Sequence, residues 1–158
     1  MDKNLLLQKL RNFCPDWLEK PDASLGNIEM LQFVLNQVLA GALEIKIEQL
    51  TKEQIVGTVP YKHQTANVVG FMHGGTIFTT GDTLAGALLW ANTDAGTFAI
   101  TTRSEIKYIK PHKHGLLKCT VTQKSRDDRK VVLEAVFTDE AHQTISIMLV
   151  DYLLMQAG

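Results

Sequence analysis

One segment of the chain is too rich in apolar and small residues to form a helix on the protein surface. It covers residues 67–92 and reads NVVGFMHGGTIFTTGDTLAGALLWAN, with a single carboxylate at Asp82. From Ile77 onward, apolar and small residues recur at helical spacing, and large apolar side chains occupy the other directions around the axis. The segment therefore predicts a helix buried at the centre of the fold. Because an unpaired buried carboxylate is costly, Asp82 needs a specific reason to be there.

The size and charge of the chain exclude several classes of function. With 158 residues, 45% hydrophobic and 21% charged, it fits one globular domain. A net charge of −1 without a basic stripe argues against a nucleic-acid partner. Cys14 and Cys119 match no disulfide or metal spacing, which is typical of a reducing compartment. Because we find neither a signal-peptide pattern nor a bilayer-spanning apolar run, we expect a cytoplasmic protein with no membrane partner.

Helical patterns precede the first strand. Residues 3–13 and 28–40 each predict an amphipathic helix, and Asn27 is a suitable cap for the second. These helices would serve either as packing elements or as lids on the core or on a ligand channel. We expect an N-terminal helical extension, residues 1–41, packed on one domain that spans residues 42–158.

Alternating apolar residues predict the strands. Alternation begins at Leu43, and a second strand is expected at residues 54–60. The central helix should run to about Thr93 and be closed by residues 94–96, with Gly96 in a left-handed conformation. Four further strands are expected at about residues 97–110, 115–125, 130–139 and 143–154, with alternation at Leu117, Cys119 and Val121, at Val131, Leu133, Ala135 and Phe137, and at Ile145, Ile147 and Leu149. Short gaps favour an antiparallel meander, so we predict an α+β fold in which one antiparallel sheet wraps around the central helix.

This layout and three polar positions resemble a known family. Asn67 lies six residues before the histidine of a His-Gly-Gly motif at residues 73–75, and Asp82 lies nine residues after that histidine. Over residues 42–155 the chain resembles the hotdog-fold acyl-CoA thioesterases of the phenylacetyl-CoA (PaaI-like) type, including the strand end at residues 108–111. The resemblance implies a hotdog fold and hydrolysis of acyl-CoA thioesters.

The residues themselves fit that chemistry. Thioester hydrolysis needs donors for the carbonyl oxygen and a group that activates the attacking water. Gly74 and Gly75 would let a carbonyl approach backbone N–H groups at a helix start, although they could serve helix–sheet packing alone. Asp82 would act as general base or as direct nucleophile, or it could be a structural partner in a helix interface.

The spacing of these groups predicts a dimer. Gly74 and Asp82 are eight residues apart, which is about 12 Å of helix rise. One thioester cannot touch both groups in one chain, because attack requires contacts of about 3 Å. We therefore predict a homodimer with shared sites. The resemblance implies the same, with two sites per dimer and dimers of dimers in many members.

The resemblance also implies individual roles. The Asn67 side chain and the Gly74 N–H would bind the thioester carbonyl, and His73 would hold the loop. From the residues alone, Asn67 could instead form an Asx turn, and His73 could be a structural hydrogen bonder or a base.

A hydroxyl on the strand after the helix would orient the water in such an enzyme. Counting back from residues 108–111 gives this role to Thr101. Strand parity with Tyr108 could turn Thr102 inward instead; of the two threonines we favour Thr101.

Basic residues at the ends of hairpins are candidates for binding coenzyme A. Lys110, Arg129 and Lys130 could contact its phosphates, together with Gly75 and Thr102 near the acyl group, although generic surface charge is the simpler interpretation. The His-Lys-His run at residues 112–114 lacks a further ligand, so we expect a solvated turn and no metal. Coenzyme A is part of the substrate, so no separate cofactor is expected.

Two other functions remain open. One is a hotdog enoyl-CoA hydratase or dehydratase with His73 as the base. The other is a non-catalytic acyl-CoA binding protein. Asp82 together with the glycine-rich helix start favours the hydrolase.

Overall fold

The computed structural model describes residues 2–157. The helices are α1 (Lys3–Phe13), α2 (Asn27–Leu35), α3 (Leu39–Ala42) and α4 (Gly74–Asn92), with a single 3-10 turn at His63–Thr65. The strands are β1 (Lys46–Leu50), β2 (Gln54–Pro60), β3 (Thr97–Tyr108), β4 (Leu116–Asp127), β5 (Lys130–Thr138) and β6 (Thr144–Gln156). None of the helices in this described part of the chain is long and apolar enough to cross a membrane.

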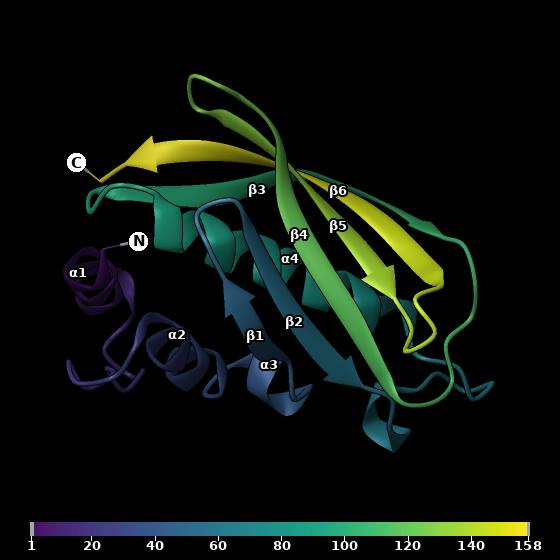
Figure 1. Cartoon of the computed structure of the whole chain (residues 1–158). Helices are drawn as coiled ribbons and strands as arrows, with labels where there is room; N and C mark the ends of the chain where they lie inside the picture. Colours follow the sequence, from purple (N-terminus) through teal and green to yellow (C-terminus); the bar gives the residue numbers. More distant parts are fainter. Residues whose placement is uncertain (1, 158) are drawn as a thin grey trace.

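The six strands form one antiparallel sheet that curves around α4 (Figure 1). Helix α4 begins three residues before the predicted apolar stretch at Ile77, because the two glycines and Thr76 form its first turn. Its buried face packs against every strand from β2 to β6. This arrangement confirms the predicted α+β hotdog fold.

The order of the strands differs from the predicted meander. The sheet runs β1-β2-β4-β5-β6-β3, so that β3 pairs with β6 and not with β4. Only β4, β5 and β6 form a meander. The connection from β3 to β4 contains Pro111 and crosses to the other side of the sheet, where β4 pairs with β2. As a result β3 lies at the edge of the sheet with one free side.

The inward face of β6 is the opposite of the predicted one. Ile145, Ile147 and Leu149 were expected to face the core, but the buried series along β6 is Ser146, Met148, Val150, Tyr152 and Leu154. Ile145 is also buried, because a register shift between Phe137 and Thr138 disturbs the pairing at the start of β6. Both faces of β6 are apolar, so its alternation did not distinguish them. The predicted inward residues of β4 and β5 are buried.

Two helix ends also differ from expectation. Gly26, not Asn27, precedes the first residue of α2, and α2 ends at Leu35 before the separate short helix α3. Gly96 has no left-handed conformation. Helix α4 ends at Asn92, within one residue of the predicted Thr93, but Thr93 is extended, and the buried Lys9 Nζ donates to the carbonyl oxygens of Trp90 and Thr93 at 3.0 and 3.2 Å. Lys9 therefore caps α4 from α1.

The N-terminal helices share the core of the sheet and α4. Helix α1 packs on α4, and α2 packs on both α1 and β1 (Figure 1). Leu6, Leu10, Met30 and Leu31 are buried in the same cluster as the inner face of the sheet. The extension is thus packed directly against the central helix.

Candidate active site

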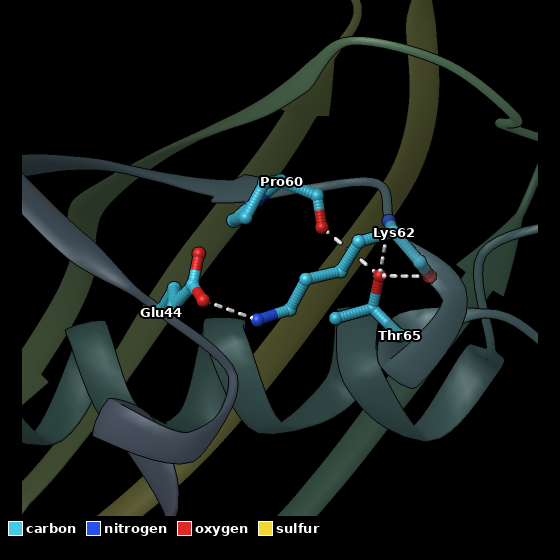
Figure 2. Close-up of polar contacts among 4 residues, drawn as sticks. All are labelled: Glu44, Pro60, Lys62 and Thr65. Atoms are coloured by element: carbon cyan, nitrogen blue, oxygen red, sulfur yellow. Dashed lines mark hydrogen bonds and ion pairs between the residues drawn. The ribbon is translucent and has the colours of Figure 1, made fainter.

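A buried threonine organises the loop that leads to the central helix. Figure 2 shows Thr65 Oγ1 between the Pro60 carbonyl oxygen and the Lys62 N–H, each at 2.9 Å. The Lys62 side chain pairs with Glu44. The Thr65 carbonyl oxygen accepts a hydrogen bond from the His73 N–H at 2.8 Å. Thr65 therefore ties the start of the loop to its end.

Within this loop, Asn67 forms an Asx turn. Its Oδ1 accepts from the N–H groups of Val69 and Phe71, both at 3.1 Å. Gly70 takes a φ of +82°, which glycine adopts without strain. Because the oxygen is used as an acceptor, the Asn67 amide is held in one orientation. Its Nδ2 group can still donate to a ligand.

His73 closes the N-terminus of α4. Its Nδ1 accepts from the Gly75 N–H at 2.8 Å, and its carbonyl oxygen accepts from the N–H groups of Thr76 and Ile77. Of the four N–H groups in the first turn, only that of Gly74 has no acceptor among the described residues. This free N–H lies at the positive end of the helix dipole and can stabilise a developing negative charge.

Tyr108 fixes the position of Gly74. Its hydroxyl donates to the Gly74 carbonyl oxygen at 3.0 Å, and burial raises the pKa of Tyr108. A Cβ on Gly74 would come within 3.1 Å of the Tyr108 oxygen, so a side chain there would displace the tyrosine. Asn67, Gly74, Tyr108, Lys110 and His112 all line one cavity of about 360 Å³. Lys110 donates to Gln143 Oε1 at 2.8 Å.

Asp82 lies in the third turn of α4 and contacts two hydroxyl groups. Thr101 Oγ1 donates to Asp82 Oδ1 at 3.1 Å. The Tyr152 hydroxyl donates to the Asp82 carbonyl oxygen at 3.1 Å and lies 3.4 Å from Oδ1. Burial and the neighbouring Asp82 carboxylate raise the pKa of Tyr152, so it remains a donor. Asp82, Thr101 and Tyr152 line a separate cavity of about 310 Å³.

The other predicted binding residues lie elsewhere. A register shift between Thr101 and Arg103 turns Thr102 away from Asp82, and Thr102 Oγ1 donates to the Asp151 carbonyl oxygen at 3.1 Å. Thr102 and Lys130 line a different cavity. Arg129 lies with Lys130 at the turn between β4 and β5, and neither lines the cavity of Asp82 or that of Asn67.

Tyr108 and Tyr152 are the site residues that sequence reasoning missed. Tyr108 stands in the strand end that carried the family resemblance, but no role was given to it. Tyr152 was missed because the inward face of β6 was predicted on the wrong parity. The available signal was an even-numbered series, Met148, Val150, Tyr152 and Leu154, that is as apolar as the odd-numbered one.

His112 differs from its expected place in a solvated turn. It is 4% exposed and packs edge-on against Tyr61, with 6.4 Å between ring centroids. Burial first, and then the neighbouring His114, lower its pKa, so His112 is neutral near pH 7. Its carbonyl oxygen accepts from the Met72 N–H at 2.7 Å, which links the end of β3 to the loop before α4.

The structure thus divides the predicted site into two halves. Asn67 and Gly74 line one cavity, and Asp82 and Thr101 line another, with no lining residue in common. A carbonyl donor site and a carboxylate are both present in one chain, but they do not face the same space.

Comparison with solved structures places this fold among hotdog proteins. A thioesterase from Haemophilus influenzae matches with a TM-score of 0.79 at 16% identity, over 84% of this chain and 92% of that chain. The PaaI protein of the E. coli phenylacetic acid degradation operon matches with a TM-score of 0.69 at 20% identity, over 75% and 84%. A Streptococcus mutans protein bound to acetyl-CoA matches with a TM-score of 0.66 at 23% identity, over 72% and 90%. At these identities the likeness establishes the fold.

Comparison at the level of sequence gives the family. A search of the curated proteins found no match. Residues 33–152 match the family described as "Domain of unknown function (DUF4442)", and this match starts within α2 and ends at Tyr152 near the end of β6. Because it covers well over half of the sequence, the chain belongs to the DUF4442 family, here with the hotdog fold of PaaI-like thioesterases.

Proposed function

We propose that the protein is an acyl-CoA thioesterase that hydrolyses its substrate to a free acid and coenzyme A at sites shared between two subunits. The observation that carries this proposal is the Asp82 carboxylate, which Thr101 and Tyr152 hold at one end of an apolar cavity. Such a carboxylate can accept a proton from water next to a bound acyl group. The fold similarity to a thioesterase and to a protein bound to acetyl-CoA supports the same substrate class.

One subunit would bind the thioester carbonyl oxygen. The free Gly74 N–H and the Asn67 Nδ2 group are the two donors that the loop presents, and both line the same cavity. Donors already held in place stabilise the negative oxygen of a tetrahedral intermediate without reorganising during the reaction. Gly75 has no side chain, so it leaves room for the thioester carbonyl to approach these two donors.

The other subunit would supply Asp82 and Thr101. Asp82 takes a proton from water, and the hydroxide adds to the acyl carbon while the carbonyl oxygen becomes negative. Collapse of this intermediate breaks the carbon–sulfur bond, and the departing thiolate takes the proton back from Asp82. Thr101, bonded to Oδ1, keeps the carboxylate in position and leaves Oδ2 free for the water. Direct attack by Asp82 is the alternative mechanism.

The division into two cavities supports a homodimer, because only a second copy can bring the donors to the carboxylate. Dimers of dimers are compatible with this assembly. The proposal includes no metal and no separate cofactor, and it places the enzyme in the cytoplasm. Lys110 lines the same cavity as the loop donors, so we propose it as a contact to a coenzyme A phosphate.

The hydratase alternative is less favoured. His73 uses Nδ1 to accept from the Gly75 N–H and so acts as a helix cap, which a base positioned for an enoyl-CoA would not do. A non-catalytic acyl-CoA binder would bind the same thioesters without turnover, so measurement of turnover distinguishes it from the hydrolase that the held Asp82 carboxylate favours.

The test is hydrolysis of a panel of acyl-CoA thioesters by wild type, Asp82→Ala and Asp82→Asn. Loss of thioester ultraviolet absorbance is the better readout, because the half-buried Cys14 thiol would react with a thiol reagent. We expect both variants to lose about 10²- to 10⁴-fold in kcat, the usual contribution of a general base. Equal rates for wild type and both variants would refute the proposal, and so would wild type that binds the panel without turnover.

A further inference from the structure

We infer that the cavity beside Asp82 is the binding site of the acyl chain, and that helices α1 and α2 close it so that it accepts a medium-chain or aryl acyl group. The identification of the occupant as an acyl chain rests on the proposed function. The size, polarity and closed end of the cavity are properties of the structure itself.

The walls of the cavity are apolar except at one end. Its apolar lining comes from Leu10 of α1, from Leu31, Val34 and Leu35 of α2, and from Trp90 and Ala99. Among the described residues 2–157, Asp82 is the only charged one that lines it, and Thr101 beside Asp82 is exposed to solvent. A ligand that fits must therefore be apolar along its length and polar where it reaches Asp82.

The cavity follows one face of α4 away from the carboxylate. Asp82, Gly86 and Trp90 all line it and are spaced four residues apart, so they lie one above the other on that face. From Asp82 to Trp90 the helix rises about 12 Å. A fully extended chain advances about 3.6 Å for every three bonds, so ~12 Å accommodates about ten bonds.

The volume leads to the same size class. An apolar cavity of about 150 Å³ holds one benzene molecule. The cavity of about 310 Å³ is twice as large and, on the same scale, would hold about twelve carbon atoms. An octanoyl or phenylacetyl group fits this space, whereas a hexadecanoyl group does not.

The N-terminal extension closes the far end. Leu10 is fully buried and Leu31 is 3% exposed, so the floor of the cavity is shut off from solvent. The Phe13 ring packs on Trp90 with 6.4 Å between centroids. Lys9 bonds to the Trp90 carbonyl oxygen at 3.0 Å and fixes α1 against this part of α4. The extension therefore sets the depth of the cavity.

The variant Gly86→Leu tests this inference without disturbing the fold. A Cβ on Gly86 meets only the Tyr152 hydroxyl at 3.8 Å, so a side chain there has room to enter the cavity. Replacing a glycine within a helix also raises helix propensity. Gly86→Ala is the matched control, because it makes the same backbone change while it fills little of the cavity.

Binding can be measured without turnover through the fluorescence of Trp90. The background is Trp17→Phe, since Trp17 is 73% exposed and does not line the cavity. The probes are S-octyl-coenzyme A, a thioether that cannot be hydrolysed, and 1-octanol, which lacks coenzyme A. We expect both to shift the emission of Trp90 saturably in the Trp17→Phe protein and in Gly86→Ala. In Gly86→Leu the added side chain would occupy part of the space that the octyl chain uses. We expect the affinity for both probes to fall ~10-fold or more, which corresponds to the loss of one or two buried methylene groups of the probe.

The second readout is the rate of hydrolysis of four substrates, butanoyl-, octanoyl-, phenylacetyl- and hexadecanoyl-coenzyme A. We expect wild type to prefer octanoyl or phenylacetyl, and Gly86→Leu to lose kcat/KM for these two by ~10-fold or more and for butanoyl by a smaller factor, because the shorter chain fills less of the cavity. Leu35→Ala, which widens the cavity, should move the preference toward the longer chain.

The two proposals fail in different ways. A protein that hydrolyses nothing but binds both probes, with Gly86→Leu weakened, would refute hydrolysis and retain the apolar cavity as a medium-chain binding site. A protein that hydrolyses acyl-CoA while Gly86→Leu leaves probe binding and chain-length preference unchanged would refute the cavity assignment and retain the thioesterase.

Discussion

Two adjacent threonines of β3 have different surroundings, although strand parity and the count back from residues 108–111 disagreed about which one faces Asp82. Thr101 donates to the Asp82 carboxylate, and Thr102 donates to a backbone carbonyl oxygen of β6. The register shift between Thr101 and Arg103 causes this difference. A bulge changes strand parity, and simple alternation counted from Tyr108 cannot detect it.

This pair provides a matched test of the role of Thr101. We expect Thr101→Val to lower kcat by ~10- to 100-fold, because a hydrogen bond to a charged group contributes about 1.5–3 kcal/mol. Thr102→Val makes the same chemical change and should leave kcat within about twofold, since its hydroxyl does not reach Asp82. Rates are measured on the best substrate of the acyl-CoA panel. Equal loss in the two variants would mean that strand stability, not positioning of Asp82, is responsible.

The individual site residues were predictable to an unequal degree. Asp82, Asn67 and Gly74 could be named because their spacing in sequence is the family signature. Tyr152 could not, because both faces of β6 are apolar and its inward face depends on pairing with β5. The Asx turn of Asn67 was one of two interpretations, and the structure contains that turn together with a free amide nitrogen.

At the scale of elements, α4 determines how the rest of the chain is arranged. Its burial was readable from its apolar sequence, as were the strand ranges, because alternation and helical spacing are local properties. The pairing of β3 with β6 was not readable, because it depends on where the connection after Tyr108 runs across the sheet. The cap of α4 was missed for a similar reason, although the end of the helix was predicted to within a residue. Its cap, Lys9, lies 81 residues before Trp90 in the sequence.

Two glycines of α4 should respond oppositely to substitution by alanine. A Cβ on Gly81 would lie 2.7 Å from the Met148 sulfur and 3.1 Å from the Phe137 ring, so Gly81→Ala forces the core apart. We expect it to lower the free energy of unfolding by about 1–3 kcal/mol. Gly86→Ala meets no close atom and should raise it by roughly 0.5–1 kcal/mol. Urea denaturation measures both, and destabilisation by the two substitutions alike would contradict the packing described.

The contact between α1 and the end of α4 should depend on pH. Burial lowers the pKa of Lys9 from 10.5 to about 8, partly opposed by Asp94. The folded state thus binds fewer protons than the unfolded state between about pH 8 and pH 10.5, so stability must rise with pH across that window. We expect the unfolding free energy of wild type relative to Lys9→Met to increase by about 1–3 kcal/mol from pH 8 to pH 10.5. Comparison with Lys9→Met removes the contribution of the other lysines, and a constant difference would contradict the prediction.

At the scale of the whole molecule, β3 is a long strand with a free edge. It extends over 12 residues, pairs only with β6, and exposes Ile100 and Tyr108, with Ile109 exposed directly after it. Such an edge invites pairing with another strand unless it is covered. Because β3 contains Thr101, which contacts Asp82, pairing along this edge would bring a second copy close to Asp82. This supports the shared site.

Mixing two inactive variants tests whether sites are shared. Asp82→Ala disables one half and Asn67→Ala the other, so a mixed dimer contains one intact site and one site with both changes. Random reassociation should restore about one quarter of wild-type activity, because half of the dimers are mixed and each has one working site. The control is a mixture of Asp82→Ala and Thr101→Val, which alter the same half and should not complement. Absence of recovery in dimers proven to be mixed would place the whole site within one chain.

The hydroxyl of Tyr108 joins the end of β3 to the first turn of α4, and that of Tyr152 joins β6 to the third. These two hydrogen bonds hold the central helix at one position along the sheet. The distance between the free Gly74 N–H and the Asp82 carboxylate is therefore fixed within each copy. In a two-fold symmetric dimer the same distance applies to both shared sites. A second subunit that is correctly placed at one site is therefore correctly placed at the other.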